Sequence, residues 1–173
     1  MDLSEVRPGS KIRIGERIYI VLFHGTTSTG ILTESPVTAM RFGDDNDFRT
    51  SEVRRYLNTT FCEELAYVVG GENINVFQIS LETDDGTDKD VFCRDHITLL
   101  TTDMYRRFRH LIPPIRDCWW WLATPKSKAE GWSRSVCYVC EGGVLLWDDS
   151  GCSNDVRPFC NLNSSFSNFQ VVS

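Results

Sequence analysis

The chain has 173 residues, 41% hydrophobic and 24% charged, which suits one domain with a sizeable apolar core. Acidic residues outnumber basic ones by 24 to 18, and this net charge of −6 argues against nucleic-acid binding, which normally needs a positive surface. No apolar run reaches the roughly 18–20 residues that cross a bilayer, and residues 1–15 lack the features of a signal peptide. We therefore expect no membrane insertion, and we expect most of the seven cysteines to be free thiols.

Residues 1–40 favour β-structure. The apolar-rich segments 11–14 and 17–23 flank Gly15-Glu16, a two-residue turn with glycine where a positive φ is easiest. This pattern predicts a hairpin. A further strand is predicted over residues 30–33, after a loop over residues 26–29.

Short helices are predicted next. Residues 50–51 can cap a first helix, whose apolar residues follow helical spacing. A second helix is predicted to begin after Asn58, capped by a threonine, and to stop at Gly70. Asp103 is expected to cap a third helix over residues 104–110.

The C-terminal third favours irregular strands. The bulky run at residues 119–122 suits a buried strand, with at least one of its three tryptophans in the core and another near the surface. Further strands are predicted over residues 135–140, 144–147 and 156–162. Residues 82–90 form a polar loop rather than a domain boundary. Short helices early and strands late predict one α+β domain over residues 1–173.

No motif for catalysis, cofactor binding or metal binding stands out. The three histidines lie far apart, and no nucleophile elbow, Walker loop, Rossmann fingerprint or H-E-x-x-H motif occurs. Cys137 and Cys140 match C-x-x-C, but residues three apart on a strand point to opposite faces, so we expect filler rather than a zinc or redox site. The acidic stretches 44–47 and 84–90 lack the EF-hand order and are predicted to be solvated loops.

Trp132 and Trp147 each lie among small polar residues. A large aromatic side chain in such a setting is often a contact residue for a partner. The alternative is that each loop folds back and covers its own tryptophan. Both hypotheses stay open from the sequence.

Several motifs, in order along nearly the whole chain, resemble a family of uncharacterised domains common in Firmicutes and their prophages. They are Leu57-Asn58, TDKDVF at 87–92, LLT at 99–101, WWLATP at 120–125 and VRPFC at 156–160. That family typically shows W-W-L-R-S-P and later G-V-R-P. It is similar to the C-type-lectin-like fold that also underlies formylglycine-generating enzymes. The resemblance implies short helices packed on small antiparallel sheets, with an irregular, loop-rich C-terminal half.

The chain departs from the family pattern at two places. Ala123-Thr124 stands where the family has Arg-Ser, so we expect a polar anchor beside the tryptophans to be missing. Asp155 stands where the family has a glycine, which is expected to alter the turn before Val156.

Residues 131–155 resemble, more narrowly, the variable proteins of diversity-generating retroelements, in which reverse transcription randomises adenines. Randomised codons of this kind never encode Lys, Glu or Gln, and the window holds no lysine and one glutamate. Trp132 and Trp147 depart from the pattern, because their codons end in G. The resemblance implies fixed residues at Val136, Val139, Gly143 and 156–158. It implies twelve variable, ligand-binding residues: Trp132, Arg134, Ser135, Tyr138, Cys140, Leu146, Trp147, Asp148, Asp149, Gly151, Cys152 and Asn154.

The function implied by the resemblance is a binding module rather than an enzyme. It would be encoded by a phage or prophage and would present residues 131–155 to a host surface protein or glycan. Aromatic side chains would supply rigid contact area, and charged and amide side chains directional contacts. The same analogy implies a homo-oligomer, with a trimer at a phage tail tip expected. The location would be the virion or the bacterial cytoplasm.

Two other functions remain as alternatives. A phage-encoded protein that inhibits an intracellular host factor would suit the acidic charge, because such a surface docks on a basic partner. An oxidase of the formylglycine-generating type is less favoured. It would need two cysteines that bind copper, and Cys137, Cys152 and Cys160 are the candidates, but the family's arginine- and serine-rich signature is missing.

Overall fold

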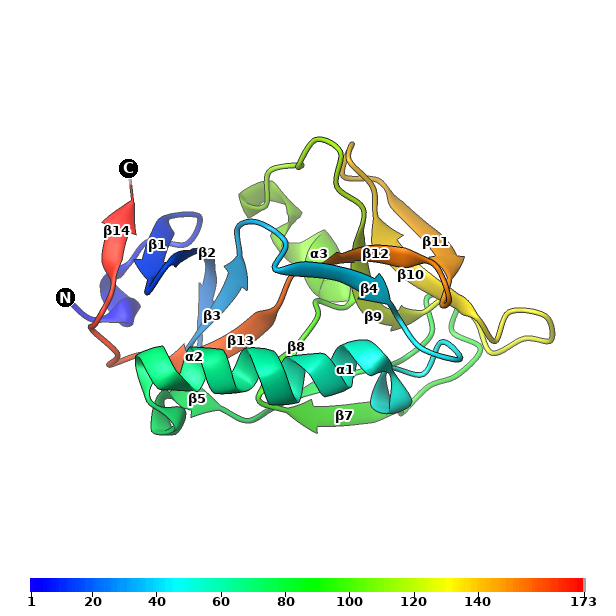
Figure 1. Cartoon of the computed structure of the whole chain (residues 1–173), viewed down its shortest axis with the longest axis horizontal. Coiled ribbons are helices and arrows are strands. Elements are labelled where there is room, and N and C mark those ends of the chain that lie inside the picture. The colour runs from blue at the N-terminus through cyan, green and yellow to red at the C-terminus, as the bar shows by residue number, and fades with distance from the viewer. Residues whose placement is uncertain (173) are drawn as a thin grey trace.

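A computed structural model describes residues 1–172 as an α+β protein built mostly of antiparallel strands (Figure 1). The α-helices are α1 (Glu52–Tyr56), α2 (Cys62–Val69) and α3 (Thr102–Phe108). Tighter turns are η1 (Leu3–Glu5), η2 (Phe48–Thr50), η4 (Gly71–Asn73) and η5 (Arg109–Leu111), and η3 (Leu57–Phe61) is a π-helical turn. No helix within the described residues has the length and apolar character of a membrane span. The α+β prediction is confirmed.

The larger sheet brings both ends of the chain together. Its strand order is β14-β1-β2-β3-β13-β5, and β8 also pairs with β13. The strands are β1 (Lys11–Ile14), β2 (Arg17–His24), β3 (Ser28–Thr33), β5 (Ile74–Asn75), β8 (Ile97–Thr98), β13 (Phe159–Asn163) and β14 (Gln170–Val172). The predicted β1–β2 hairpin is confirmed, with Gly15 at φ +57° in its turn. The predicted loop over 26–29 is too long, because Ser28 and Thr29 already pair with β13.

The smaller sheet carries most of the window 131–155. Its order is β11-β10-β9-β12-β4. The strands are β4 (Thr38–Arg41), β9 (Trp120–Pro125), β10 (Ser135–Val139), β11 (Leu145–Asp149) and β12 (Ser153–Val156), while β6 (Phe77–Ser80) and β7 (Phe92–Asp95) form a separate ribbon. The predicted single strand over 156–162 is wrong. The chain leaves this sheet after Val156 and enters the larger one at Phe159, because Pro158 cannot donate to a strand ladder.

One continuous helical segment runs through α1, η3 and α2, so the predicted break after Asn58 is wrong. The Asn58 amide instead fixes the helix to β8, since Nδ2 donates to the Ile97 carbonyl at 2.9 Å and Oδ1 accepts from the Ile97 N–H at 3.1 Å. Thr59 does not cap a new helix, because its hydroxyl donates to the Arg55 carbonyl at 2.7 Å. Gly70, at φ +82°, ends the segment as predicted.

Helix α3 begins earlier and ends earlier than predicted. Its N-cap is Thr101, whose hydroxyl oxygen accepts from the Met104 N–H at 3.2 Å. Asp103 lies inside the first turn, where it pairs with Arg106 at 3.0 Å. The helix stops at Phe108. The sequence holds several residues able to cap, and the tertiary position of the chain selects Thr101.

Strand β9 lies at the centre of the core and is buried along its whole length. Trp121 is 0% exposed and belongs to the main apolar cluster, whereas Trp120 is 3% exposed and belongs to a second cluster. Neighbouring residues on a strand face opposite ways, so β9 separates the two clusters. Trp119, just before the strand, is 42% exposed. The expected division of these tryptophans between core and surface is confirmed.

The two departures from the family motifs are accommodated locally. Thr124 Oγ1 accepts the Thr102 N–H at 2.9 Å, so a polar anchor is present in β9, contrary to expectation. Asp155 accepts the Trp119 N–H through Oδ2 at 3.1 Å, and its own N–H donates to the Trp119 carbonyl at 2.7 Å. Both side chains therefore hold β9 to its neighbours. The expectation of an altered turn before Val156 is wrong, because Asp155 lies within β12.

Replacement of Trp120 should test the core assignment. We expect Trp120→Ala to lower the free energy of unfolding by about 3–5 kcal/mol, because it removes a buried indole and leaves a cavity. The matched control, Trp119→Ala, should cost less than about 1 kcal/mol, as for other partly exposed positions. Urea denaturation followed by circular dichroism measures both. Equal losses for the two variants would contradict the assignment.

Candidate functional site

Exposed and buried side chains separate cleanly within and just after the window 131–155. Each of the twelve predicted binding residues is exposed or half-buried. The residues predicted to be fixed are all buried: Val136, Val139, Gly143, Val156, Arg157 and Pro158. Many of the exposed side chains belong to the β10–β11 hairpin. This hairpin lies at the edge of the smaller sheet, because β11 pairs with β10 alone within the described chain. An edge hairpin can bury one set of side chains and leave the rest in solvent.

The strand register distributes the predicted binding residues over two faces rather than one. Cys137 pairs with Trp147, and Tyr138 pairs with Leu146, so the members of each pair share a face and the two pairs point oppositely. Trp147 therefore lies on one face of the hairpin. Tyr138 and Leu146 lie on the other face.

The tryptophan face consists of Trp132, Trp147 and Lys126. The two indole rings lie 5.8 Å apart between centroids at an interplanar angle of 57°, and Lys126 Nζ lies 4.8 Å from the Trp147 ring. Trp132 remains 38% exposed and Trp147 47% exposed. Each ring therefore partly covers the other and both keep free surface, so a role for Trp132 and Trp147 as contact residues for a partner stays a prediction.

A buried amide holds the segment that carries Trp132. Asn46 is 0% exposed, and its Nδ2 lies 3.0 Å from the Ser127 carbonyl, 3.1 Å from the Trp132 carbonyl and 3.2 Å from the Ser135 carbonyl. Its Oδ1 accepts from Lys128 Nζ at 3.0 Å. These contacts fix a segment that contains no regular secondary structure, so Trp132 is presented from a defined position.

The second face, here the tyrosine face, consists of Tyr138, Leu146, Asp148 and Asn154. The Tyr138 ring packs edge-on against buried Trp121 at 6.5 Å, and Asn154 Nδ2 donates to Asp148 Oδ2 at 3.1 Å. Leu146 is 40% exposed. This face offers an apolar centre with hydrogen-bonding groups beside it.

An ion pair between Arg134 and Asp149 lies at the end of the β10–β11 hairpin opposite its turn. Arg134 donates to Asp149 through Nε at 2.9 Å and Nη2 at 2.7 Å, and through Nη1 to the Asp44 carbonyl at 2.9 Å. The hydrogen bonds from Arg134 and from the Gly151 N–H lower the pKa of Asp149 to about 2. Ser135 and Cys152 lie at this end, whereas Cys140 lies at the opposite end, in the β10–β11 turn.

The cysteines do not gather into one site. All seven are free thiols, and no group of three or more His, Cys, Asp or Glu side chains suited to a metal ion occurs in residues 1–172. Burial raises the pKa of Cys137 to about 12 and raises the pKa of Cys160 still further. Cys137 belongs to the second apolar cluster, and Cys160 belongs to the main one.

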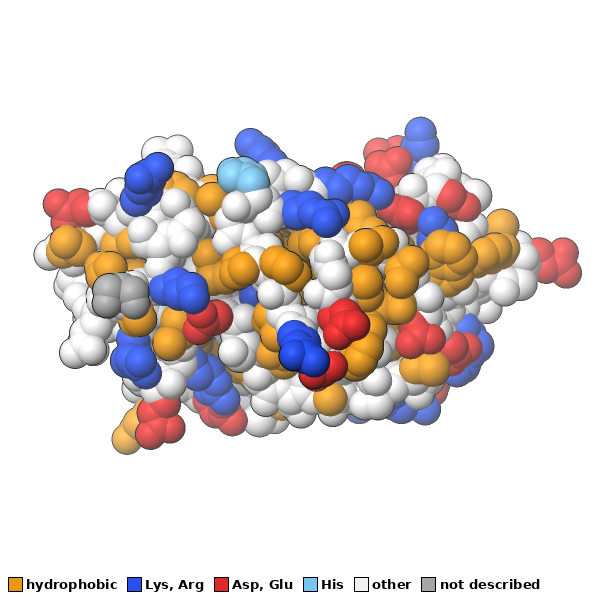
Figure 2. All heavy atoms as spheres, turned by 90° about the horizontal axis from the view of Figure 1, so that it is seen from above, with side chains coloured by type: hydrophobic (Ala, Val, Ile, Leu, Met, Phe, Trp, Pro, Cys, Tyr) orange, Lys and Arg blue, Asp and Glu red, His pale blue; other side chains and the backbone are white. Residues whose placement is uncertain are grey.

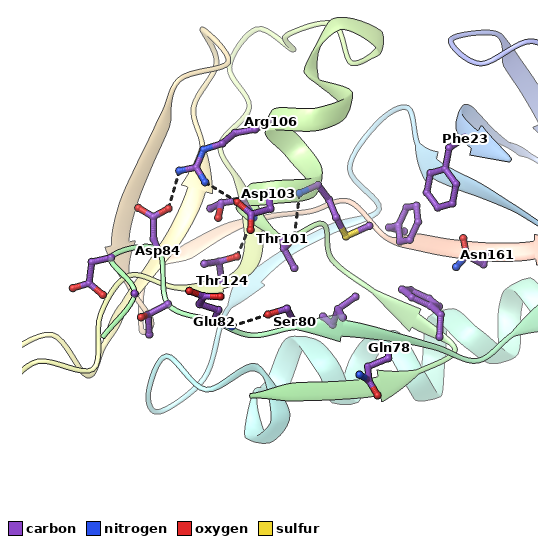
Figure 3. Close-up of a pocket in the computed structure, with 18 residues that line it drawn as sticks. Phe23, Gln78, Ser80, Glu82, Asp84, Thr101, Asp103, Arg106, Thr124 and Asn161 are labelled. Carbon is purple, nitrogen blue, oxygen red and sulfur yellow. Dashed lines mark hydrogen bonds and ion pairs between the residues drawn. The ribbon is translucent and has the colours of Figure 1, made fainter. Parts of the chain in front are cut away.

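A cleft of about 650 Å³ is drawn in Figure 3, and one of its lining residues, Asp84, connects it to Lys126 of the tryptophan face. Strand β6, the start of α3 and the side chain of Asn161 on β13 form its walls, and aromatic rings form part of its floor. Asp84 links the two features, because its carboxylate accepts from Arg106 at 2.9 Å inside the cleft and from Lys126 at 2.8 Å outside it. Burial raises the pKa of Asp84, but these two hydrogen bonds outweigh that effect and lower the pKa below its usual value.

Sequence analysis missed both the cleft and the role of Asn46. The cleft is assembled from segments 77–86, 101–106 and 159–161 together with Phe23 and Thr124, and none of these carries a motif for catalysis or ligand binding. Asn46 stood inside an acidic stretch interpreted as a solvated loop, yet it is fully buried. An asparagine flanked by aspartates gives no local signal that distinguishes these two outcomes.

Comparisons with known proteins provide no relative: no protein-family model matches the chain, and neither a curated protein nor a solved structure is significantly similar to it.

The Asn46 amide gives a test of how Trp132 is held. We expect Asn46→Ala to lower the free energy of unfolding by about 2–3 kcal/mol, because a fully buried amide is lost together with its contacts to one buried and two partly buried carbonyls. The substitution should also loosen the contact between the Trp132 and Trp147 rings. It should therefore weaken the near-ultraviolet circular dichroism signal that arises from this ring pair. Asp45→Ala, at the exposed neighbour, is the control and should change neither quantity appreciably. An unchanged tryptophan signal in Asn46→Ala would refute the positioning role.

Proposed function

We propose that the protein is a non-enzymatic binding module that presents residues 131–155 to a host surface protein or glycan. The observation that carries the proposal is the separation within this window: the twelve predicted binding residues have exposed surface, and the interspersed fixed residues are buried. Side chains with free surface can differ without changing the core, so such a surface can be adapted to a target at little cost in stability.

The composition of the exposed surface supports binding. Trp132, Trp147 and Leu146 are each at least 38% exposed, and a large aromatic with two side-chain torsions loses little entropy when it is buried at an interface. Figure 2 displays hydrophobic side chains gathered over the half of the molecule that holds the smaller sheet, with acidic and basic groups among them. Apolar anchors surrounded by polar groups are typical of protein interfaces.

The finer assignments rest on the resemblance and belong to the same proposal. A C-type-lectin-like fold is supported by the burial of the residues that carry the motifs, including Trp120, Trp121, Arg157 and Phe159. Diversification by a retroelement is supported by the exposure of the twelve residues. Encoding by a phage or prophage, a place at a tail tip and assembly into a homo-oligomer follow from the same analogy.

The two alternatives are less well supported. An inhibitor of an intracellular host factor would use the same exposed surface, so the identity of the target distinguishes it from a surface-binding module. An oxidase of the formylglycine-generating type would need two adjacent thiolates, but Cys137 and Cys160 belong to separate apolar clusters and their burial favours the protonated thiol.

Trp147→Ala is the variant that tests binding. We expect it to weaken binding to intact cells of the bacterial host by a factor that corresponds to about 2 kcal/mol or more, as for a central aromatic contact. Its thermal midpoint should stay close to that of the unchanged protein, because the indole is about half exposed. Labelled protein and flow cytometry measure binding, and differential scanning calorimetry measures stability.

Val171→Ala is the matched control, because Val171 is 53% exposed on β14, which lies at the opposite end of the molecule from β10 and β11 (Figure 1). It should change neither binding to host cells nor the thermal midpoint. The proposal fails if the unchanged protein binds no host cells, or if Trp147→Ala and Val171→Ala bind equally well.

A further inference from the structure

Strand β6 has a backbone edge that no other strand of residues 1–172 covers. It pairs with β7 alone, in the register Phe77 with Asp95 through Ser80 with Phe92. The Leu81 N–H donates to the Val91 carbonyl at 2.7 Å, which continues the ladder. Because alternate residues of an antiparallel strand bond to opposite sides, the N–H and C=O groups of Gln78 and Ser80 point away from β7. In Figure 3 this edge faces the cleft, with α3 on the opposite wall.

The floor of the cleft is an ordered aromatic surface. The Phe159 ring contacts the Phe77 ring edge-on at 5.4 Å and the Phe23 ring at 6.1 Å. A side chain at Gly30 would collide with the Phe23 ring, so glycine at this position lets the ring lie on the backbone of β3. Phe159 is 0% exposed, so it holds the two other rings in place, and the half-buried rings of Phe23 and Phe77 provide the apolar surface for a ligand.

A buried amide in the wall lacks a partner. Asn161 lines the cleft and is 9% exposed, and its Oδ1 has no hydrogen-bond partner among the described residues. A buried polar atom without a partner is costly. This oxygen is enclosed, so a ligand in the cleft would complete its hydrogen bonding once the Asn161 side chain turns toward the cleft. Figure 3 places Asn161 at the same end of the cleft as Phe23.

The rim of the cleft has an excess of negative charge. Glu82, Asp84, Asp85 and Asp103 line it, against a single basic residue, Arg106. Arg106 already pairs with Asp84 and Asp103, whereas Glu82 takes part in no ion pair within the described chain. This imbalance favours a cationic ligand over an anionic one.

From these four features we infer that the cleft binds an extended peptide segment, which adds as a strand to the free edge of β6. The peptide backbone bonds to Gln78 and Ser80, one apolar side chain rests on the phenylalanine floor, and a lysine or arginine side chain reaches Glu82. The volume of about 650 Å³ lies in the range of natural ligand sites. The free strand edge favours a peptide over another cationic ligand, because it offers donors and acceptors at the spacing of a β-ladder. This site is separate from the surface proposed above.

The probe is a random heptapeptide library displayed on phage and selected on the immobilised protein. We expect enrichment of sequences with an aromatic or aliphatic residue near a lysine or arginine. An enriched peptide is then synthesised and its binding is measured by calorimetry. Failure to enrich any sequence, or enrichment of acidic sequences, would overturn the inference.

Strand addition has a specific signature in hydrogen exchange. The amide protons of Gln78 and Ser80 should exchange quickly in the free protein and be protected in the complex, since each gains a backbone partner. A peptide N-methylated at the bonded position should bind about tenfold more weakly or worse, because it loses a donor. Binding that leaves both amides unprotected would instead indicate a ligand held by side chains, and would refute strand addition.

Variants of the cleft complete the test. Glu82→Gln should weaken the peptide about twofold to fivefold, as expected for a partly exposed ion pair, and Glu63→Gln on α2 is the matched control that should have no effect. Asn161→Leu should weaken the peptide about tenfold. Leu146→Ala, on the tyrosine face, should leave peptide affinity unchanged even if it alters binding to host cells. Equal affinities for Glu82→Gln, Asn161→Leu and the unchanged protein would refute the site.

Discussion

The arrangement of the two sheets depends on one buried guanidinium group. Arg157 is 1% exposed, and its Nε and Nη2 donate to the Thr33 carbonyl at 3.1 and 2.9 Å. The guanidinium also lies 4.6 Å from the centre of the Trp120 ring. It takes part in no ion pair within residues 1–172, and its burial lowers the pKa to about 10. A carbonyl and an aromatic face, rather than a carboxylate, offset part of the cost of burying this charge, and Nη1 has no hydrogen-bond partner among the described residues.

Arg157 acts where the chain passes from one sheet to the other. Thr33 ends β3 in the larger sheet, and Trp120 begins β9 in the smaller sheet, so one side chain ties the two together. The neighbouring backbone reinforces this link, because the Thr33 N–H donates to the Pro158 carbonyl at 3.1 Å and the Val37 N–H donates to the Val156 carbonyl at 2.9 Å. The β10–β11 hairpin is held separately, by the buried side chains of Val136, Cys137 and Val139 on β10, and no residue of β11 is buried. Its exposed residues can therefore serve recognition.

The sequence predicted the parts of the fold that depend on local signals. Gly15 located the first hairpin, Gly70 located the end of α2, and the tryptophan run located the buried strand β9. The predictions were wrong where a contact with a residue far away in the chain determined the local structure. A helix break was predicted after Asn58, but its side chain bonds to Ile97 within a continuous helical segment. The strand predicted over 156–162 is divided between the two sheets.

The candidate binding surface was predictable in its exposure but not in its shape. The buried residues of the hairpin are the apolar Val136, Cys137 and Val139 of β10, whereas no residue of β11 is buried. The polar end of β11, Asp148-Asp149, indicates this exposure in the sequence. The division into two faces depends on strand register, and the position of Trp132 depends on Asn46, which is 86 residues away in the chain. The cleft depends on five separate parts of the chain, between Phe23 and Asn161, so no local pattern could indicate it.

The most direct test of the proposed variable surface is to sequence the encoding locus, with those of close relatives, across residues 131–158. We expect differences to fall on the twelve exposed residues and to match adenines of a nearby template repeat. The buried residues Val136, Val139, Gly143 and 156–158 should be unchanged. An invariant window with no reverse transcriptase gene nearby, or differences spread equally over the buried residues, would contradict the proposal.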